Sequence, residues 1–188
     1  MSISKRNWTV LLIGGASGTG KSSLAYGLAH FYGVSVLEID DIMEAVKALT
    51  TKELLPAIHS DNFWDAGIDG NVSWLIDVSK ELLPALKAVI DRHIEDNLPV
   101  IIEGDFIHPE LLAVFNDPKV KAIFVQEDKE HIMRNYQSRE GGDPQHYRAD
   151  ISTGYGKWIS DTCMNLGIGL IEARPWDTAV DRAVEHLL

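Results

Sequence analysis

The sequence predicts an α/β fold in which a parallel β-sheet is covered by helices on both faces. Five short apolar runs rich in Val and Ile, each close to strand length, alternate with longer segments of helical period. Parallel strands that are buried on both faces have continuous apolar sequences of this kind. The chain has 188 residues, of which 45% are hydrophobic and 24% charged, so we expect one domain over residues 1–188 with a sizeable core.

The order of the elements follows from these patterns. The expected strands are residues 8–13, 34–39, 98–102, 120–125 and 166–171. A helix over residues 22–32 is expected to end at Gly33. The longest helix is expected over residues 71–96, with a kink at Pro84. Shorter helices are expected over residues 42–49, from the capping residue Asp128 to about residue 137, and over residues 177–188.

Composition excludes several classes of protein. Seventeen Lys and Arg against 28 Asp and Glu give a net charge of −11, which opposes binding to nucleic acid or to an anionic membrane surface. The apolar run at residues 10–13 stops at Gly14 and is too short for a signal sequence or a membrane span. The single cysteine, Cys163, excludes an internal disulfide and fits a reducing compartment. We therefore expect a cytoplasmic protein.

Residues 15–22 form a glycine-rich motif between the first expected strand and the first expected helix. Their sequence, Gly-Ala-Ser-Gly-Thr-Gly-Lys-Ser, matches the phosphate-loop pattern G-x-x-x-x-G-K-[ST] at every fixed position. Glycines permit positive φ angles, so that backbone N–H groups converge on an anion at the N-terminus of the next helix. The motif predicts an ATP site formed by Gly15, Ala16, Ser17, Gly18, Thr19, Gly20, Lys21, Ser22 and Ser23.

Two polar side chains of the motif have predicted chemical roles. Lys21 is expected to reach the β- and γ-phosphates, and the Ser22 hydroxyl to ligate Mg²⁺. Glu103 ends the third expected strand, where a carboxylate can hold the metal ion or its waters, and Asp105 is an alternative for that role.

Asp40 and Asp41 close the second expected strand. A carboxylate beside the phosphate loop can accept the proton of an attacking hydroxyl or hold Mg²⁺ through water. We favour Asp40 for this catalytic and metal-binding role, and expect Asp41 to cap the helix over residues 42–49 or to be a second ligand.

The guanine-specific signatures N-K-x-D and D-x-x-G are absent, and the chain is small for a motor or a helicase, which leaves mainly a compact phosphotransferase. Residues 14–23, 38–41 (Glu-Ile-Asp-Asp) and 100–104 (Val-Ile-Ile-Glu-Gly) resemble the P-loop small-molecule kinases, such as the shikimate, gluconate, chloramphenicol, nucleoside and nicotinamide riboside kinases. The phosphate loop and the Ile-Ile-Glu-Gly segment are similar to 2-phosphoglycerate kinase. The resemblance implies a P-loop NTPase three-layer sandwich with strand order 2-3-1-4-5, an acceptor region at about residues 40–70 and a lid at about residues 134–150.

In this family, lid arginines close on the transferred phosphoryl group, which implies that role for Arg134 and Arg139. Their spacing of five points them to different helix faces, so Arg134 is expected on the helix and Arg139 on the loop after it, with Arg148 beyond. The resemblance also implies that Arg174 or its backbone contacts the base, while Trp176 either covers the base or packs the final helix.

The segment 59–67 lies where the family binds its acceptor. Phe63 and Trp64 could stack on a ring while neighbouring polar groups bind hydroxyls, or they could be core residues; the polar candidates are Asp61, Asn62 and Asp65. Residues 38–105 contain 15 acidic and 5 basic side chains, a net charge of −10, and Arg92 is their one arginine. Because arginine forks are the usual grip on phosphate, this favours a neutral or cationic acceptor with a free hydroxyl over a phosphorylated one.

The sequence thus predicts an ATP- and Mg²⁺-dependent kinase of a small, unphosphorylated molecule. Alternatives are a regulatory nucleotide-binding protein without an acceptor, a kinase of a phosphorylated metabolite, and, less favoured, a P-loop hydrolase or a sulfotransferase-like enzyme. The expected partner is the small-molecule acceptor, with a homodimer left open and neither nucleic acid nor membrane expected.

Overall fold

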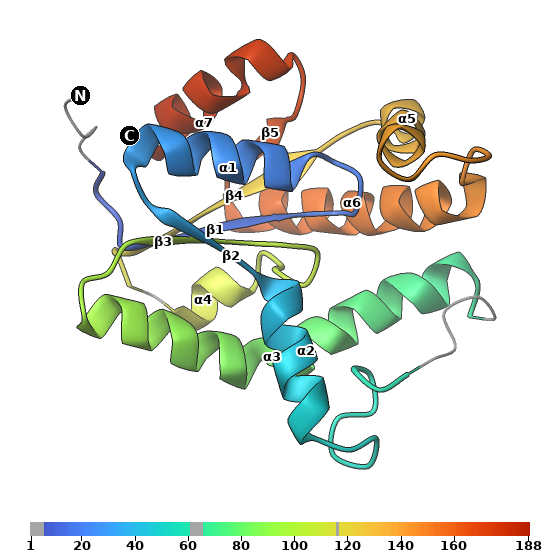
Figure 1. Ribbon diagram of the computed structural model, residues 1–188, viewed down its shortest axis with the longest axis horizontal. Coiled ribbons are helices and arrows are strands. Elements are labelled where there is room, and N and C mark those ends of the chain that lie inside the picture. The colour runs from blue at the N-terminus through green and yellow to red at the C-terminus, as the bar shows by residue number, and fades with distance from the viewer. Residues whose placement is uncertain (1–5, 61–65, 116) are drawn as a thin grey trace.

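The computed structural model describes residues 6–60, 66–115 and 117–188 and contains one five-stranded parallel sheet (Figure 1). Its strands lie in the order β2-β3-β1-β4-β5. Their bounds are β1 Val10–Gly15, β2 Ser35–Glu38, β3 Val100–Glu103, β4 Val120–Gln126 and β5 Leu170–Glu172. The predicted fold class and the strand order implied by the family resemblance are both confirmed.

Helices cover both faces of the sheet, as Figure 1 shows. Alternate residues of β1 face opposite layers: Leu11 and Ile13 pack with helices α1 and α7, whereas Val10 and Leu12 pack with α3 and α6. The helices are α1 Lys21–Tyr32, α2 Ile39–Leu49, α3 Gly67–Glu95, α4 Leu111–Phe115, α5 Lys129–Glu140, α6 His146–Leu166 and α7 Ala179–Leu187, and the 3₁₀ turn η1 spans Trp176–Thr178.

Three differences from the expected elements bear on the site. Helix α6 was not predicted, because glycines and polar residues interrupt its apolar pattern, and its first turn lies at the end of the range expected for the lid. It ends at Leu166 with Gly167 in a left-handed cap, φ 65°, so the last strand begins only at Leu170 and not at residue 166. Helix α2 begins at Ile39, which places Asp40 and Asp41 in its first turn, and neither caps it.

The carboxyl ends of the strands meet at one edge of the sheet. β1 lies between β3 and β4, and its end leads into the phosphate loop. β3 pairs β1 with Glu103 beside Ile13, so the third strand ends close to that loop. Ligands of open parallel sheets bind outside these carboxyl ends, at the point where the strand order reverses.

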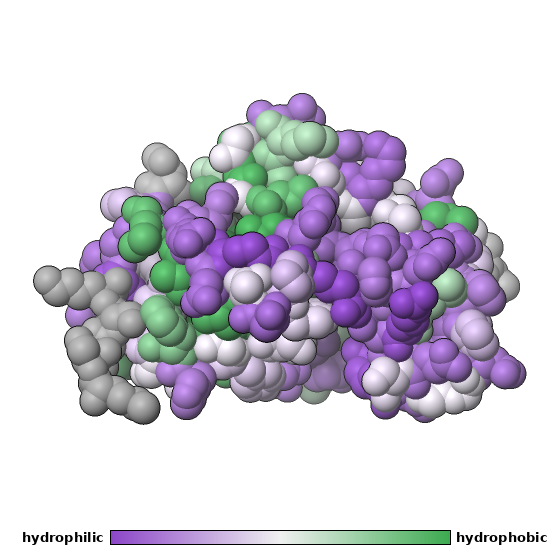
Figure 2. Space-filling model, turned by 90° about the horizontal axis from the view of Figure 1, so that it is seen from above, coloured by the Kyte–Doolittle hydropathy of each residue, from purple (hydrophilic) through white to green (hydrophobic). Residues whose placement is uncertain are grey.

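None of the described helices combines the length and the apolar character that crossing a bilayer requires. Hydrophilic residues dominate the face seen from above in Figure 2, and its hydrophobic residues gather in small groups.

Candidate active site

The phosphate loop is held open by contacts to its own backbone. The Oγ1 of Thr19 and the Nζ of Lys21 both donate to the carbonyl oxygen of Ala16, at 2.8 and 3.1 Å. Gly18 and Gly20 adopt positive φ angles of 80° and 91°, which L-residues with side chains avoid. Helix α1 begins directly at Lys21, so its free N–H groups face the same space as the loop. This arrangement suits an anion such as a phosphate.

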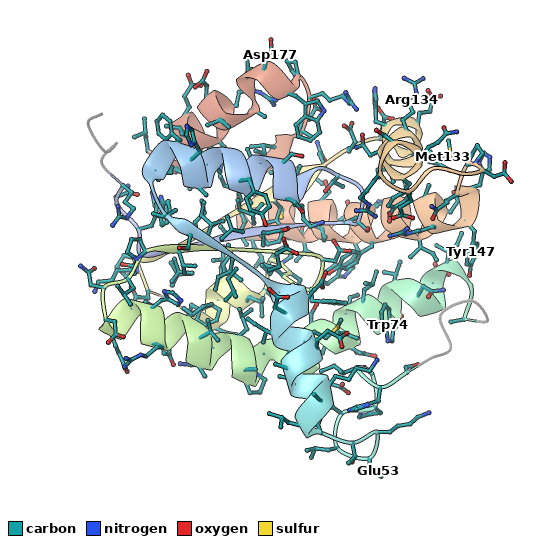
Figure 3. All side chains as sticks on the ribbon, in the orientation of Figure 1. Glu53, Trp74, Met133, Arg134, Tyr147 and Asp177 are labelled. Atoms are coloured by element: carbon teal, nitrogen blue, oxygen red, sulfur yellow. The ribbon has the colours of Figure 1, made fainter. Side chains whose placement is uncertain are left out.

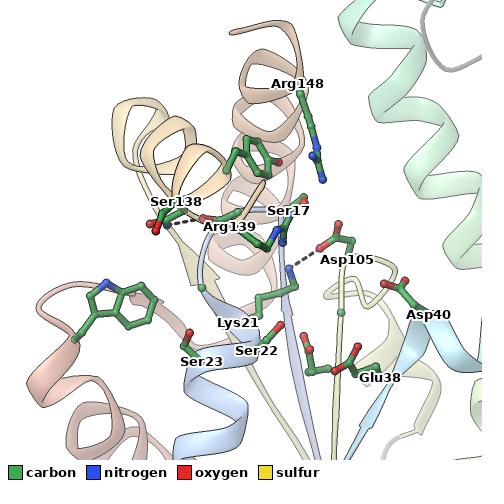
Figure 4. Close-up of a pocket in the computed structure, with 17 residues that line it drawn as sticks. Ser17, Lys21, Ser22, Ser23, Glu38, Asp40, Asp105, Ser138, Arg139 and Arg148 are labelled. Atoms are coloured by element: carbon green, nitrogen blue, oxygen red, sulfur yellow. Dashed lines mark hydrogen bonds and ion pairs between the residues drawn. The ribbon is translucent and has the colours of Figure 1, made fainter. Parts of the chain in front are cut away.

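A cavity of about 860 Å³ lies over the loop, between the ends of β2 and β3, helices α5 and α6, and η1 (Figure 4). We call it the donor cavity. It is lined by Ser17, Gly18, Gly20, Lys21, Ser22, Ser23, Glu38, Asp40, Glu103, Gly104, Asp105, Asn135, Tyr136, Ser138, Arg139, Arg148 and Trp176. Its size matches the pockets that hold small molecules and cofactors.

Lys21 and Asp105 form an ion pair in the donor cavity, drawn as a dashed line in Figure 4. The Nζ of Lys21 lies 2.5 Å from Oδ1 of Asp105, and the two side chains are 7% and 27% exposed. Burial alone would lower the pKa of Lys21, but the charge and hydrogen bond of Asp105, with a further contribution from Glu103, outweigh burial and raise this pKa. Lys21 is therefore a fixed cation, already balanced by a carboxylate.

Ser22 and Glu103 place two oxygen donors at the base of the donor cavity. Glu103 is buried, and burial raises the pKa of its carboxyl, while a hydrogen bond from the Ser22 hydroxyl opposes that rise. A hydroxyl and a carboxylate are the hard oxygen ligands that Mg²⁺ prefers. The donor set thus fits a magnesium ion.

Asp40 extends from the first turn of α2 into the donor cavity. Desolvation, followed by the nearby charge of Asp105, raises the pKa of the Asp40 carboxyl. A carboxyl with a raised pKa is a better proton acceptor than an ordinary one. Asp41, the neighbouring residue, is exposed and lines neither this cavity nor the acceptor cavity described below.

Arg139 and Arg148 line the donor cavity, and both donate hydrogen bonds to Glu140. Glu140 Oε1 lies 2.5 Å from a guanidinium nitrogen of Arg139, and Arg148 donates to both Glu140 oxygens at 2.9 and 2.8 Å. Hydrogen bonds from Gln145, Arg139 and Arg148 lower the pKa of Glu140 to about 2. The Arg148 guanidinium also lies over the Tyr136 ring, 4.1 Å from its centroid.

The two lid arginines singled out in the sequence are thus separated. Arg139 lies in the last turn of α5 and not on a following loop, because the helix continues to Glu140 before Gly141 ends it. Arg134 is on another face of α5, with its side chain 68% exposed and 3.7 Å from Glu130 (Figure 3). Arg134 does not line the donor cavity, whereas Arg148 does.

Trp176 and Arg174 occupy the side of the donor cavity formed by η1 and the segment before it. The Trp176 ring lies directly on Gly20, where a Cβ would be 1.8 Å from the indole. Arg174 does not line the cavity: its Nε donates to Glu127 at 3.0 Å and a terminal nitrogen to Asn135 at 3.4 Å. Asn135 in turn donates to the carbonyl of Gly18 at 2.8 Å, so Arg174 supports the phosphate loop through Asn135.

A second cavity, of about 370 Å³, adjoins the first, and we call it the acceptor cavity. The two cavities have Ser17, Asp40, Asp105, Tyr136 and Arg148 in common. The remaining wall is formed by Met43, Glu44, Trp74, Leu75, Phe106, Ser152 and Tyr155. Asp61, Asn62, Phe63, Trp64 and Asp65, the residues that the sequence suggested for the acceptor, lie outside the described residues.

Sequence reasoning missed several residues of the two cavities. Asn135, Tyr136 and Ser138 belong to the segment between the two predicted lid arginines, and that position is the signal that could have found them. Trp74 and Tyr155 lie within helices and are indistinguishable from core aromatics in the sequence. Glu38 belongs to the quoted motif at residues 38–41, yet its place in the donor cavity was not predicted.

Comparison with solved structures shows the class of fold. A gluconokinase from Sinorhizobium meliloti aligns with 97% of this chain and 93% of its own, with a TM-score of 0.56 and 15% identity. A shikimate kinase from Bacteroides thetaiotaomicron aligns with 95% of this chain and 98% of its own, with a TM-score of 0.53 and 17% identity. The fold is that of the P-loop small-molecule kinases, and the resemblance predicted from the sequence is confirmed.

The relatives found by sequence share one name, 2-phosphoglycerate kinase. The 2-phosphoglycerate kinase of Methanopyrus kandleri is 28% identical over 139 residues, which are 68% of this chain and 42% of the relative. That of Methanocaldococcus jannaschii is 34% identical over 110 residues, 55% of this chain and 36% of the relative. The chain therefore spans less than half the length of these relatives. No protein-family model matches it.

Proposed function

We propose that this protein is an ATP-dependent phosphotransferase that moves the γ-phosphoryl group to a hydroxyl of a small, unphosphorylated molecule. The observation that carries the proposal is the junction of the two cavities. Asp40, Asp105 and Arg148 line both, so a hydroxyl in the acceptor cavity and a phosphate above Lys21 can face each other across them. Phosphoryl transfer needs mainly this positioning and electrostatic stabilisation of the transferred group.

The residues of the two cavities have separate roles in the proposed reaction. The backbone of the phosphate loop and Lys21 bind the β- and γ-phosphates. Arg139 and Arg148 line the space of the transferred group and would bind it in exchange for Glu140. The acceptor oxygen forms a bond to the γ-phosphorus as the bond to the bridging oxygen breaks, and ADP leaves. Asp40 accepts the hydroxyl proton and passes it to solvent. Bound Mg²⁺ neutralises charge on the phosphates, and Ser22 and Glu103 would hold it, with Asp40 in reach through water.

The acceptor is proposed to carry no phosphate because the acceptor cavity has no uncommitted cation among its described residues. Arg148 is already paired with Glu140, and Lys21 with Asp105. The relatives named 2-phosphoglycerate kinase favour the second candidate, a kinase of a phosphorylated metabolite, in which Arg148 would release Glu140 and bind the acceptor phosphate. A regulatory nucleotide-binding protein without an acceptor is the third.

Two substitutions test the proposal with purified protein, ATP and Mg²⁺. Lys21→Ala removes the buried cation and should abolish nucleotide binding whichever candidate is right. Asp40→Asn keeps the shape of the side chain but removes the proton acceptor, and it should lower acceptor-dependent ADP release at least about a hundredfold while nucleotide affinity stays within twofold. Equal loss of affinity and turnover in Asp40→Asn contradicts its proposed role.

An acceptor panel separates the candidates. The proposal expects ADP release with unphosphorylated alcohols, measured against buffer alone. Turnover restricted to 2-phosphoglycerate or other phosphorylated acceptors would favour the second candidate. Nucleotide binding without acceptor-stimulated turnover would favour the regulatory one.

We also propose that the protein acts in the cytoplasm, on the support of its buried, unpaired Cys163. A homodimer stays a prediction, which sedimentation of the purified chain tests.

A further inference from the structure

Four aromatic rings line the acceptor cavity. Trp74 of α3, Phe106 after β3, and Tyr136 and Tyr155 of α5 and α6 line it, together with Met43 and Leu75. Trp74 and Phe106 meet edge to face with their centroids 6.1 Å apart. Tyr155 is buried and held in place by donating its hydroxyl to the Asp105 carbonyl at 2.8 Å. Aromatic rings bury a large apolar surface and attract cations, so such walls suit an occupant with an apolar body and a positive charge.

Two carboxylates on one side of the acceptor cavity are not engaged in an ion pair with a described residue. Asp40 and Glu44 are four residues apart on α2, so they lie on the same face of that helix, and both line the cavity. Neither forms an ion pair with any described residue, whereas the third carboxylate, Asp105, is paired with Lys21.

The cations near the acceptor cavity are already committed. Arg148 makes three hydrogen bonds, two to Glu140 and one to Gln145, and it stacks on Tyr136. The Lys21 ammonium is bound by Asp105 and the carbonyl of Ala16. The charge left unbalanced at the acceptor cavity is therefore negative, at Asp40 and Glu44, and an anionic occupant would be repelled by both.

We propose that the acceptor is a hydroxylated amine, whose ammonium group is bound by Glu44 and whose apolar body lies between the aromatic walls. This inference rests on the proposed function. The hydroxyl would face Asp40 at the junction with the donor cavity, so Asp40 and Glu44 divide the two polar ends of the acceptor between them. Aromatic faces beside a carboxylate are a favourable setting for an organic cation.

In the proposed transfer, the acceptor hydroxyl oxygen forms the new bond to the γ-phosphorus. The bond between the γ-phosphorus and the bridging oxygen breaks, and ADP takes the electron pair of that bond. The hydroxyl proton goes to Asp40 and then to solvent. The ammonium group keeps its protons and its carbon–nitrogen bond throughout. It acts as a binding handle alone, and for that reason Glu44 is a specificity-determining residue and not a catalytic one.

The test compares matched acceptors that differ by one group. 2-Amino-1-phenylethanol is compared with 1-phenylethane-1,2-diol, and D-glucosamine with D-glucose, with 2-phosphoglycerate and glycerate as the anionic arm. Acceptor binding is measured by calorimetry on the protein saturated with a non-hydrolysable ATP analogue and Mg²⁺, and turnover by ADP release. The inference expects the amine of at least one pair to bind at least about tenfold more tightly than its hydroxyl partner, since charge-assisted hydrogen bonds are the stronger kind.

Glu44→Gln should remove most of that preference by weakening the amine about tenfold, while the diol and the nucleotide keep their affinities within twofold. Glu95→Gln is the matched control, because Glu95 ends α3 and lines neither cavity, and this variant should leave every affinity unchanged. Tighter binding of the hydroxyl partners or of 2-phosphoglycerate in the unsubstituted protein would overturn the inference. An amine preference that survives Glu44→Gln would overturn the role of Glu44. Selective amine binding with no ADP release would instead contradict the proposed function and leave the ligand class supported.

Discussion

The ion pair between Lys21 and Asp105 leads to a prediction about nucleotide affinity. A phosphate that binds Lys21 competes for the ammonium group with the Asp105 carboxylate, which lies 2.5 Å from the ammonium nitrogen. Asp105→Asn keeps a carbonyl oxygen that can accept from Lys21 but removes the opposing charge. We therefore expect nucleotide to bind this variant more tightly than the unsubstituted protein when Mg²⁺ is absent.

The magnitude follows from the attraction between the two charges. Opposite unit charges about 4 Å apart attract each other by about 1 kcal/mol in water and by about 4 kcal/mol at an effective dielectric constant of about 20. The usual reduction for exposed ion pairs does not apply, because Lys21 is 7% exposed and Asp105 27%. A loss of roughly 1.4 kcal/mol of this attraction corresponds to about a tenfold lower Kd.

The assay is calorimetric titration with ADP in the presence of a chelator and again with Mg²⁺. Asp161→Asn is the matched control: it removes the carboxylate from the exposed pair of Lys157 and Asp161, whose atoms lie 2.8 Å apart, and should change neither Kd. Unchanged or weaker ADP binding without Mg²⁺ would refute the competition between Asp105 and phosphate. A loss of affinity seen only with Mg²⁺ would assign Asp105 to the metal ion, a role that the sequence left open between Asp105 and Glu103.

Three further predictions concern single residues. Gly20→Ala should abolish nucleotide binding measured by calorimetry, because its φ is 91° and the new Cβ would lie 1.8 Å from Trp176; normal affinity would contradict this packing. His108 is buried, with both ring nitrogens lacking a hydrogen-bond partner among the described residues, and burial lowers its pKa below the ordinary 6.5. Below pH 6.5, His108 therefore binds more protons in the unfolded chain than in the folded one. The free energy of unfolding measured in urea should fall from pH 7 to pH 5, by up to about 1.4 kcal/mol per pH unit, and the fall should be smaller in His108→Leu. Burial raises the pKa of the Cys163 thiol to about 12, so iodoacetamide should modify it only in denaturant, and rapid modification of the folded chain at pH 8 would contradict its burial.

The phosphate loop was predictable because its function needs a fixed local geometry. Converging N–H groups require glycines at set positions, and Lys21 and Ser22 must follow them at the start of a helix, so the motif carries its structure within a few residues. The strand pattern was predictable for a similar reason, since burial on both faces leaves continuous apolar runs. The strand order came from the family resemblance, because pairing between distant strands leaves no local trace.

The lid and the acceptor cavity were predicted less well, because both depend on where helices end. Whether Arg139 lies on a loop or a helix is decided by Gly141, which ends α5. Arg148 reaches the donor cavity because α6 begins at His146, and the sequence showed no clear signal for that helix. Trp74 and Tyr155 line the acceptor cavity from α3 and α6, and nothing in the sequence distinguished them from aromatic residues of the core.

The place of β1 in the sheet has a consequence for the synthesis of the chain. Of the five strands of the sheet, β1 is made before the others, yet its two neighbours are β3 and β4, which end at residues 103 and 126. The Trp176 ring that covers Gly20 follows later still. The nascent chain thus carries a complete phosphate-loop sequence long before it has a sheet to hold that loop, and the ability to bind nucleotide should arise only when most of the chain has left the ribosome.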